Sequence, residues 1–250
     1  MTRDAVPAMA HAMSAAETEA LAHLVDEALE LLGREQLEPA RATIAEAIAM
    51  APEHAEVRTL QAELALLDED PAGARVHLEA ALAVDPELAD AHHLLARLLE
   101  DAGEHAAMVE HDLRVLELDG RADRRHAIGT PQDLAFIEEE ARRTLATLPG
   151  HLADRVEDVP VILEARPSAD IVREGFDPRA LGLFEGPTDF GRRANTGDTR
   201  PTRIVLFYAN LLAMAPDDDE LAEQVEVTVL HELGHFFGLD EDDVADLGLA

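Results

Sequence analysis

Residues 221–241 read LAEQVEVTVLHELGHFFGLDE, and this stretch decides the fold of the second half of the chain. Its apolar residues recur every three or four positions, which is the period of one face of an α-helix. Three consecutive aspartates at 217–219 offer carboxylates that cap the start of such a helix. We therefore expect a helix from Glu220 onward that docks on a sheet. Its apolar stripe consists of Leu221, Ala222, Val225, Val229, Leu233 and Phe236.

Two histidines project from a neighbouring face of this expected helix. Positions four residues apart lie one turn above each other, so His231 and His235 can present two imidazoles to one ion. Glu232 lies beside them in an H-E-x-x-H arrangement, in which the carboxylate works on a bound water. Gly238 then permits a backbone turn that brings a third, acidic ligand back toward the ion. The alternative interpretation is a helix whose histidines are solvated or cap its C-terminal end.

The composition excludes several classes of partner and of metal site. The length of 250 residues suits one large domain or two modest ones, and the formal net charge is -33. Such acidity makes nucleic acid and anionic membrane surfaces poor partners. The lack of cysteine excludes disulfides and thiolate metal sites. We find neither a signal-peptide segment nor an apolar run of membrane-spanning length, so we expect a cytoplasmic protein.

The first half of the chain repeats itself with a period of 34 residues. The repeated pattern has two small residues, a large apolar residue between them and a closing proline. Its positions are Ala40, Ile44, Ala47 and Pro52, and then Ala74, Leu78, Ala81 and Pro86. Small residues let paired helices approach closely, and we expect the proline to start the next helix. The pattern resembles the tetratricopeptide repeat, which implies an all-α helical repeat domain over residues 15–120.

A third unit of this array, from about Ala89 to Gly120, is degenerate. It carries Met108 and Asp112 where a small and an apolar residue are expected. We interpret it as a capping repeat at the end of the array. Two interpretations of the array stay open, a concave surface that binds a protein partner and a helical spacer.

The segments that follow have a mixed pattern. Residues 121–132 are basic within an acidic chain and predict a linker. Residues 133–148 have helical periodicity, and we expect strands at 159–165, 181–186 and 203–212. The predicted fold class is therefore α+β overall, with all-α repeats followed by a small α+β domain.

Four C-terminal segments carry a family resemblance. They are VPVILE (159–164), LGLFEG (181–186), RIVLF (203–207) and EQVEVTVLHELGHFFGLDE (223–241). Together they resemble a family of minimal bacterial zincin-like metallopeptidases, in which a short sheet packs on the H-E-x-x-H helix. The resemblance extends over about residues 133–250.

The resemblance implies a zinc ion held by His231, His235 and a carboxylate ten residues after the first histidine, which is Glu241. Asp240 is the alternative third ligand, and manganese or iron is the alternative metal. It further implies that Glu232 accepts a proton from the attacking water and returns it to the leaving amine.

Three hypotheses for the function follow from these patterns. The first is a zinc-dependent peptidase whose repeat domain docks a peptide or protein substrate, or a protein partner. The second is a tetratricopeptide-type adaptor whose zincin-like module has little or no activity. The third is hydrolysis of a non-peptide amide at the same metal centre.

Overall fold

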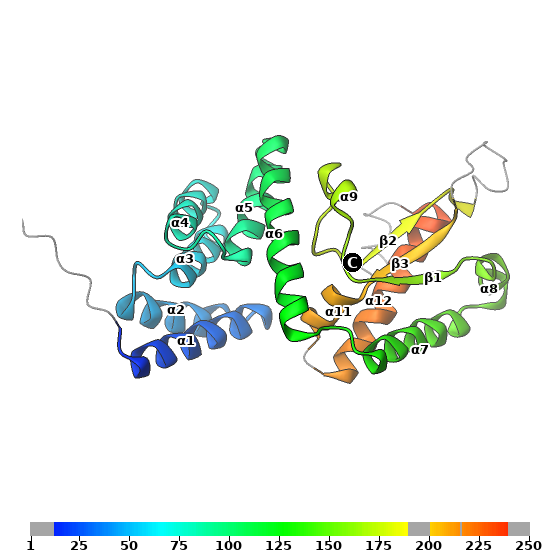
Figure 1. Ribbon diagram of the computed structural model, residues 1–250, viewed down its shortest axis with the longest axis horizontal. Coiled ribbons are helices and arrows are strands. Elements are labelled where there is room, and N and C mark those ends of the chain that lie inside the picture. Colours follow the sequence, from blue (N-terminus) through cyan, green and yellow to red (C-terminus); the bar gives the residue numbers. More distant parts are fainter. Residues whose placement is uncertain (1–12, 190–200, 216, 240–250) are drawn as a thin grey trace, which may run out of the picture. The chain divides into compact units, whose positions relative to one another are not determined.

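The computed structural model of the protein describes residues 13–189, 201–215 and 217–239. The chain divides into two compact units, Met1–Glu104 and His105–Ala250 (Figure 1). The described part of the first unit is helical, whereas the second combines helices with a three-stranded sheet. The protein is therefore α+β, as predicted. Within the described ranges, no helix is long and apolar enough to cross a membrane.

In the first unit, each helix packs against the next helix along the chain. The helices are α1 (Ala15–Gly33), α2 (Leu37–Met50), α3 (Ala55–Leu67), α4 (Pro71–Val84) and α5 (Ala89–Asp101). The small residues of the 34-residue pattern are fully buried on α2 and α4, where they allow close approach of neighbouring helices. The prolines of the pattern were expected to start helices. Pro52 and Pro86 instead lie in the turns before α3 and α5, where the fixed φ of proline suits a turn position.

Glu63 on α3 gives this unit a dependence on pH. Its side chain is half-buried, and burial followed by the charge of Asp90 raises the pKa of Glu63 to about 7. The folded unit therefore binds this proton more tightly than the unfolded chain does. Its contribution to stability is fully present below about pH 4.5 and is lost as the pH rises through about 7.

We expect Glu63→Gln to remove this pH dependence. The free energy of unfolding of the variant, relative to the original protein, then increases between pH 4.5 and pH 7. Urea unfolding followed by far-UV circular dichroism measures this difference. The exposed Glu46→Gln variant on α2 is the matched control. If the difference in unfolding free energy between Glu63→Gln and the original protein stays constant across this pH range, the raised pKa of Glu63 is contradicted.

The predicted linker at 121–132 is wrong over its first half. Helix α6 (His105–His126) continues through it, because alanine and arginine favour helices and basic side chains suit a helix C-terminus. Only residues 127–130 connect α6 to α7 (Pro131–Thr147). The helix predicted at 133–148 is thus confirmed, and its start is capped by the side chain of Thr130.

Helix α6 groups with the second unit, whereas we expected the repeat domain to extend to residue 120. It packs on α9 (Ala169–Arg173), a short helix that we did not predict. Met108 and Asp112, which depart from the repeat pattern, are almost completely buried on α6. Their departure from the pattern is consistent with a helix that serves the second unit.

The three strands of the second unit lie in the order β1-β3-β2. Strand β1 (Val161–Glu164) pairs in parallel with β3 (Arg203–Phe207), and β2 (Gly182–Glu185) pairs antiparallel with β3. All three strands were predicted, but the third ends at Phe207 instead of residue 212. The next residues form α11 (Tyr208–Met214), since alanine, leucine and methionine favour a helix there.

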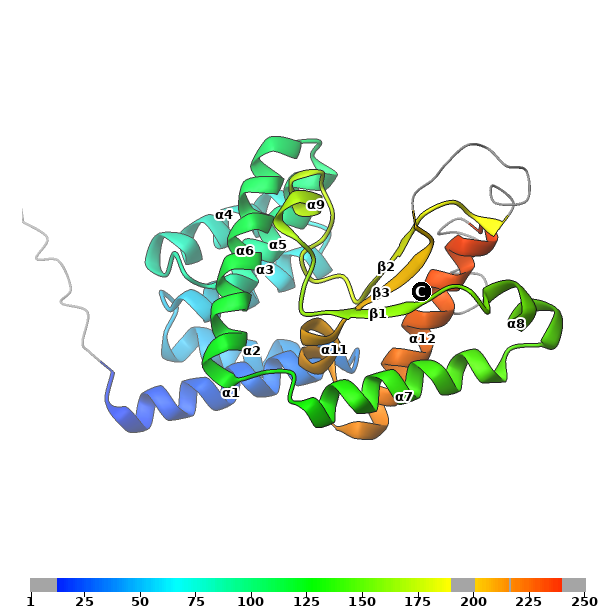
Figure 2. The same ribbon diagram turned by 45° about the vertical axis from the view of Figure 1, so that its right-hand side comes forward.

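Helix α12 (Asp218–Phe237) contacts β2 and β3, and α7 contacts β1 and α12 (Figure 2). The Asp217 carboxylate accepts hydrogen bonds of 3.0 Å from the backbone N–H groups of Asp219 and Glu220, which confirms the predicted N-cap. The predicted apolar stripe is also confirmed, except that Ala222 is only half-buried. Its buried members are Leu221, Val225, Val229, Leu233 and Phe236.

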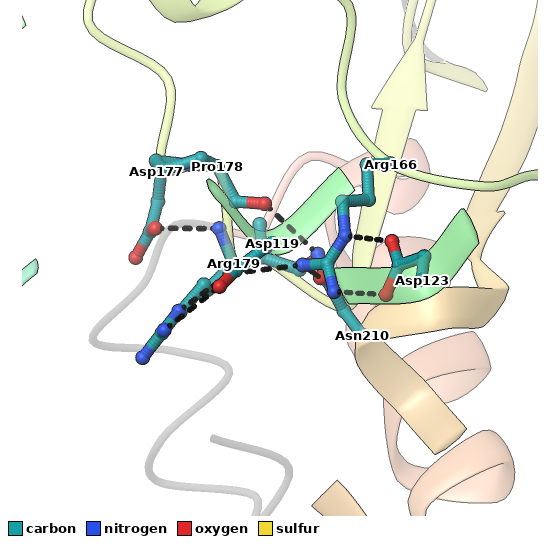
Figure 3. Close-up of polar contacts among 8 residues, drawn as sticks. Asp119, Asp123, Arg166, Asp177, Pro178, Arg179 and Asn210 are labelled. Atoms are coloured by element: carbon teal, nitrogen blue, oxygen red, sulfur yellow. Dashed lines mark hydrogen bonds and ion pairs between the residues drawn. The ribbon is translucent and has the colours of Figure 1, made fainter. Parts of the chain in front are cut away.

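A partly buried ion network joins α6 to the loops around the sheet (Figure 3). The guanidinium of Arg166 donates to both carboxylate oxygens of Asp123, at 2.5 and 2.9 Å, and to Asp119 at 3.2 Å. It also donates to the side-chain oxygen of Asn210 on α11. Arg179 donates to both oxygens of Asp119, at 2.9 and 3.1 Å. Two arginines and two aspartates balance each other, which allows these charges to be partly removed from solvent.

Replacing Arg166 by methionine leaves two largely buried aspartates with a single cation. We expect Arg166→Met to lower the free energy of unfolding of this unit by about 3–5 kcal/mol, because an uncompensated buried charge is costly. Tyr208 is the only tyrosine and the chain has no tryptophan, so its fluorescence during urea unfolding reports on this unit. The control is Arg142→Met, which removes an exposed ion pair within α7 and should cost far less stability. Equal losses for the two variants contradict a structural role for the network.

Candidate metal centre

The two histidines of the motif meet on one face of α12. The Nε2 atoms of His231 and His235 lie 3.1 Å apart, and their ring centroids are separated by 4.8 Å. Both rings are half-buried at the edge of the packed helix. Two imidazoles at this distance either share a proton in an N–H···N hydrogen bond or direct both nitrogens at one ion.

The C-terminal turn of α12 selects the tautomer of His235. Gly238 adopts a left-handed conformation with φ of 86°, and the Leu239 N–H donates to the carbonyl of Gly234 at 3.0 Å. This turn places the Leu239 carbonyl 3.3 Å from Nδ1 of His235. A carbonyl only accepts, so in the neutral imidazole Nδ1 carries the proton and Nε2 keeps its lone pair. Such a contact orients a metal-ligating imidazole from behind.

The pair fits zinc by geometry and by donor chemistry. Two nitrogens that bind one tetrahedral zinc ion at about 2.0–2.1 Å lie about 3.3 Å from each other. The separation between His231 and His235 is close to this value. Within residues 13–189, 201–215 and 217–239, no group of three His, Asp or Glu side chains has metal-binding geometry. The expected third ligand, Glu241, and its alternative, Asp240, lie outside the described residues.

Glu232 is buried against the edge of the sheet. Its residue is only 6% exposed, and it lies one position after His231 on α12. The nearest strand is β2, where Gly182 faces Glu232 and Thr228. A methyl group built on Gly182 would lie 2.9 Å from Oε1 of Glu232, so the carboxylate occupies the space over this glycine. The sequence did not identify Gly182 as part of the site, because nothing local marks it as facing α12.

Aromatic side chains and one arginine support the last turn of α12. Phe236 is fully buried and contacts Phe184 of β2, with ring centroids 5.8 Å apart. The Arg155 guanidinium, on α8 (Gly150–Val156), lies 4.7 Å from the ring centroid of Phe237. Arg155 also donates to Asp189, and this hydrogen bond raises the pKa of Arg155. Contacts from β2 and from α8 thus support the turn that carries His235.

Comparison with protein families finds a match in this region. Residues 156–249 match the model of a family described as zincin-like metallopeptidase. The match begins later than the expected residue 133 and covers less than half of the chain. No family match supports the likeness of the first unit to tetratricopeptide repeats. A comparison with curated proteins finds no match to the chain.

We expect the purified protein to bind one zinc ion per chain, and His231→Ala or His235→Ala to abolish that binding. Loss of a direct ligand should weaken affinity by more than the roughly hundredfold that outer contacts contribute. Competition with a fluorescent zinc chelator measures the affinity. The control is His126→Ala, which removes an exposed imidazole at the end of α6. Zinc affinity that is unchanged in both α12 variants would falsify the metal centre.

Proposed function

We propose that the protein is a zinc-dependent peptidase whose metal is held by His231, His235 and Glu241. The observation that carries this proposal is the 3.1 Å approach of the two Nε2 atoms, with buried Glu232 next to them on the same helix. The match of residues 156–249 to zincin-like metallopeptidases supports it independently. The lack of cysteine is consistent with a reducing compartment such as the cytoplasm.

Residues of α12 have separate roles in the proposed reaction, as metal ligands and as general base. Zinc, when bound, supplies a Lewis acid that makes a water molecule nucleophilic near neutral pH. The Glu232 carboxylate accepts the proton of the attacking water and later delivers it to the nitrogen of the leaving amine. The hydrogen bond from His235 Nδ1 to the Leu239 carbonyl keeps the imidazole in the ligating orientation.

Strand β2 supports a peptide as the substrate. One edge of β2 pairs with β3, and in the described part of the chain no strand pairs with its other edge. An extended peptide can add to such an edge through backbone hydrogen bonds. Because Gly182 of β2 faces Glu232, a peptide bound there would pass close to the general base.

Glu232→Gln tests this assignment of the base. The amide keeps the size of the side chain but cannot take up a proton, so we expect zinc binding to persist while hydrolysis falls by at least about a hundredfold. Cleavage of a diverse peptide library, analysed by mass spectrometry, measures the loss. Glu226→Gln, an exposed position on the same helix, is the control. Full activity of Glu232→Gln in a preparation free of other proteases refutes the role.

We propose that the first unit docks a substrate or partner protein for the peptidase unit. Its packed helices and its 34-residue pattern support this role. The alternative is an adaptor in which the zincin-like part is inactive. Incubation with the peptide library, with and without a chelator, separates the two. Cleavage that the chelator stops supports the peptidase, whereas binding without any cleavage supports the adaptor.

A further inference from the structure

We infer that Gly182 positions Glu232, because the absence of a side chain on β2 leaves the space that the carboxylate occupies. The inference rests on the proposed function, in which Glu232 is the general base. Gly182 and Glu232 are both buried, so their contact belongs to the packed interior and not to the surface. A Cβ atom at residue 182 would approach Oε1 and Cγ of Glu232 to 2.9 and 3.0 Å. It would also lie 2.7 Å from Cγ2 of Thr228, one turn earlier on α12.

Glycine is needed at position 182 because there is no room for a side chain, and not because of the backbone conformation. Gly182 is absent from the residues with positive φ, and it pairs with Leu206 in regular antiparallel register. Any residue can adopt that backbone, and glycine in a strand is otherwise unfavourable. A glycine that β2 does not need for its own geometry therefore serves the close approach of α12.

The neighbouring contacts leave Thr228 and α12 little freedom to move away from residue 182. Thr228 is held on α12 by a 2.7 Å hydrogen bond from its hydroxyl to the Gln224 carbonyl, so it cannot easily rotate away. The helix itself is fixed by its buried stripe, which includes Val229 and Leu233. A methyl group at residue 182 is therefore expected to move the Glu232 side chain, the more flexible of the two neighbours.

A double-mutant cycle on stability tests the contact without any measurement of hydrolysis. In the full chain, followed by the fluorescence of Tyr208, Gly182→Ala should raise the unfolding equilibrium constant by about tenfold or more. In the Glu232→Ala background the same change should have an effect about fivefold smaller, because the displaced side chain is gone. Gly150→Ala is the matched control, since a methyl group there meets nothing within 4 Å.

Activity at saturating zinc tests whether the contact positions the base. We expect Gly182→Ala to lower kcat by about tenfold or more, with KM and zinc affinity changed less than about threefold. The loss should persist in the Thr228→Ser background, in which the contact with Cγ2 is relieved and the contact with Glu232 remains. Restoration of kcat by Thr228→Ser alone overturns the inference, since the spacing of helix and strand would then explain the loss.

Three further outcomes support or overturn the positioning role of Gly182. If Gly182→Ala is too unstable to purify, recovery of folded protein in Gly182→Ala/Glu232→Ala supports the inference, and failure to recover it overturns it. Unchanged stability and kcat in Gly182→Ala also overturn it. If the original protein cleaves no peptide while the stability cycle shows coupling, Gly182 still fixes the place of the carboxylate, and only the proposed function fails.

Discussion

The docking of α12 on the sheet is the constraint on which the rest of the second unit depends. Its buried stripe fixes the rotation of the helix about its own axis, and a different rotation would change the exposure of the histidines and move Glu232 away from β2. In the observed orientation, Glu232 faces the strand and the two imidazoles lie half-buried beside it. One packing interface therefore sets the positions of the candidate base and of two candidate ligands together.

The ion network around Arg166 adds a second constraint, on the segment that leads into β2. Asn210 donates from its side-chain nitrogen to the carbonyls of Pro178 and Ala180, at 3.0 and 2.6 Å. Ala180 lies two residues before Gly182, so the network fixes the entry into β2 (Figure 3). Charges buried on α6, far away in the sequence, thereby help to hold the strand that packs on Glu232. This connection gives α6 a structural reason to belong to the second unit.

Local patterns allowed the most accurate predictions. The period of α12, its Asp217 cap and the turn at Gly238 are properties of adjacent residues, and the structure reproduces each of them. The contact between His231 and His235 follows from helical spacing alone. Glu241 and Asp240 stay predictions, because both lie outside the described residues.

Features that depend on distant partners were missed. Residues 121–126 were predicted to be part of a linker because they are basic within an acidic chain. They belong to α6 instead, and Asp123 among them pairs with Arg166. The space over Gly182 likewise becomes visible only when β2 and α12 are packed together.

A crystal structure of the zinc-loaded protein, with anomalous diffraction recorded at the zinc edge, shows directly whether α12 holds a metal ion between His231 and His235. We expect a single strong anomalous peak within bonding distance of Nε2 of both His231 and His235, with the carboxylate of Glu241 or Asp240 as a further ligand. Two imidazoles bonded to each other, with no anomalous peak between them at saturating zinc, would contradict this expectation.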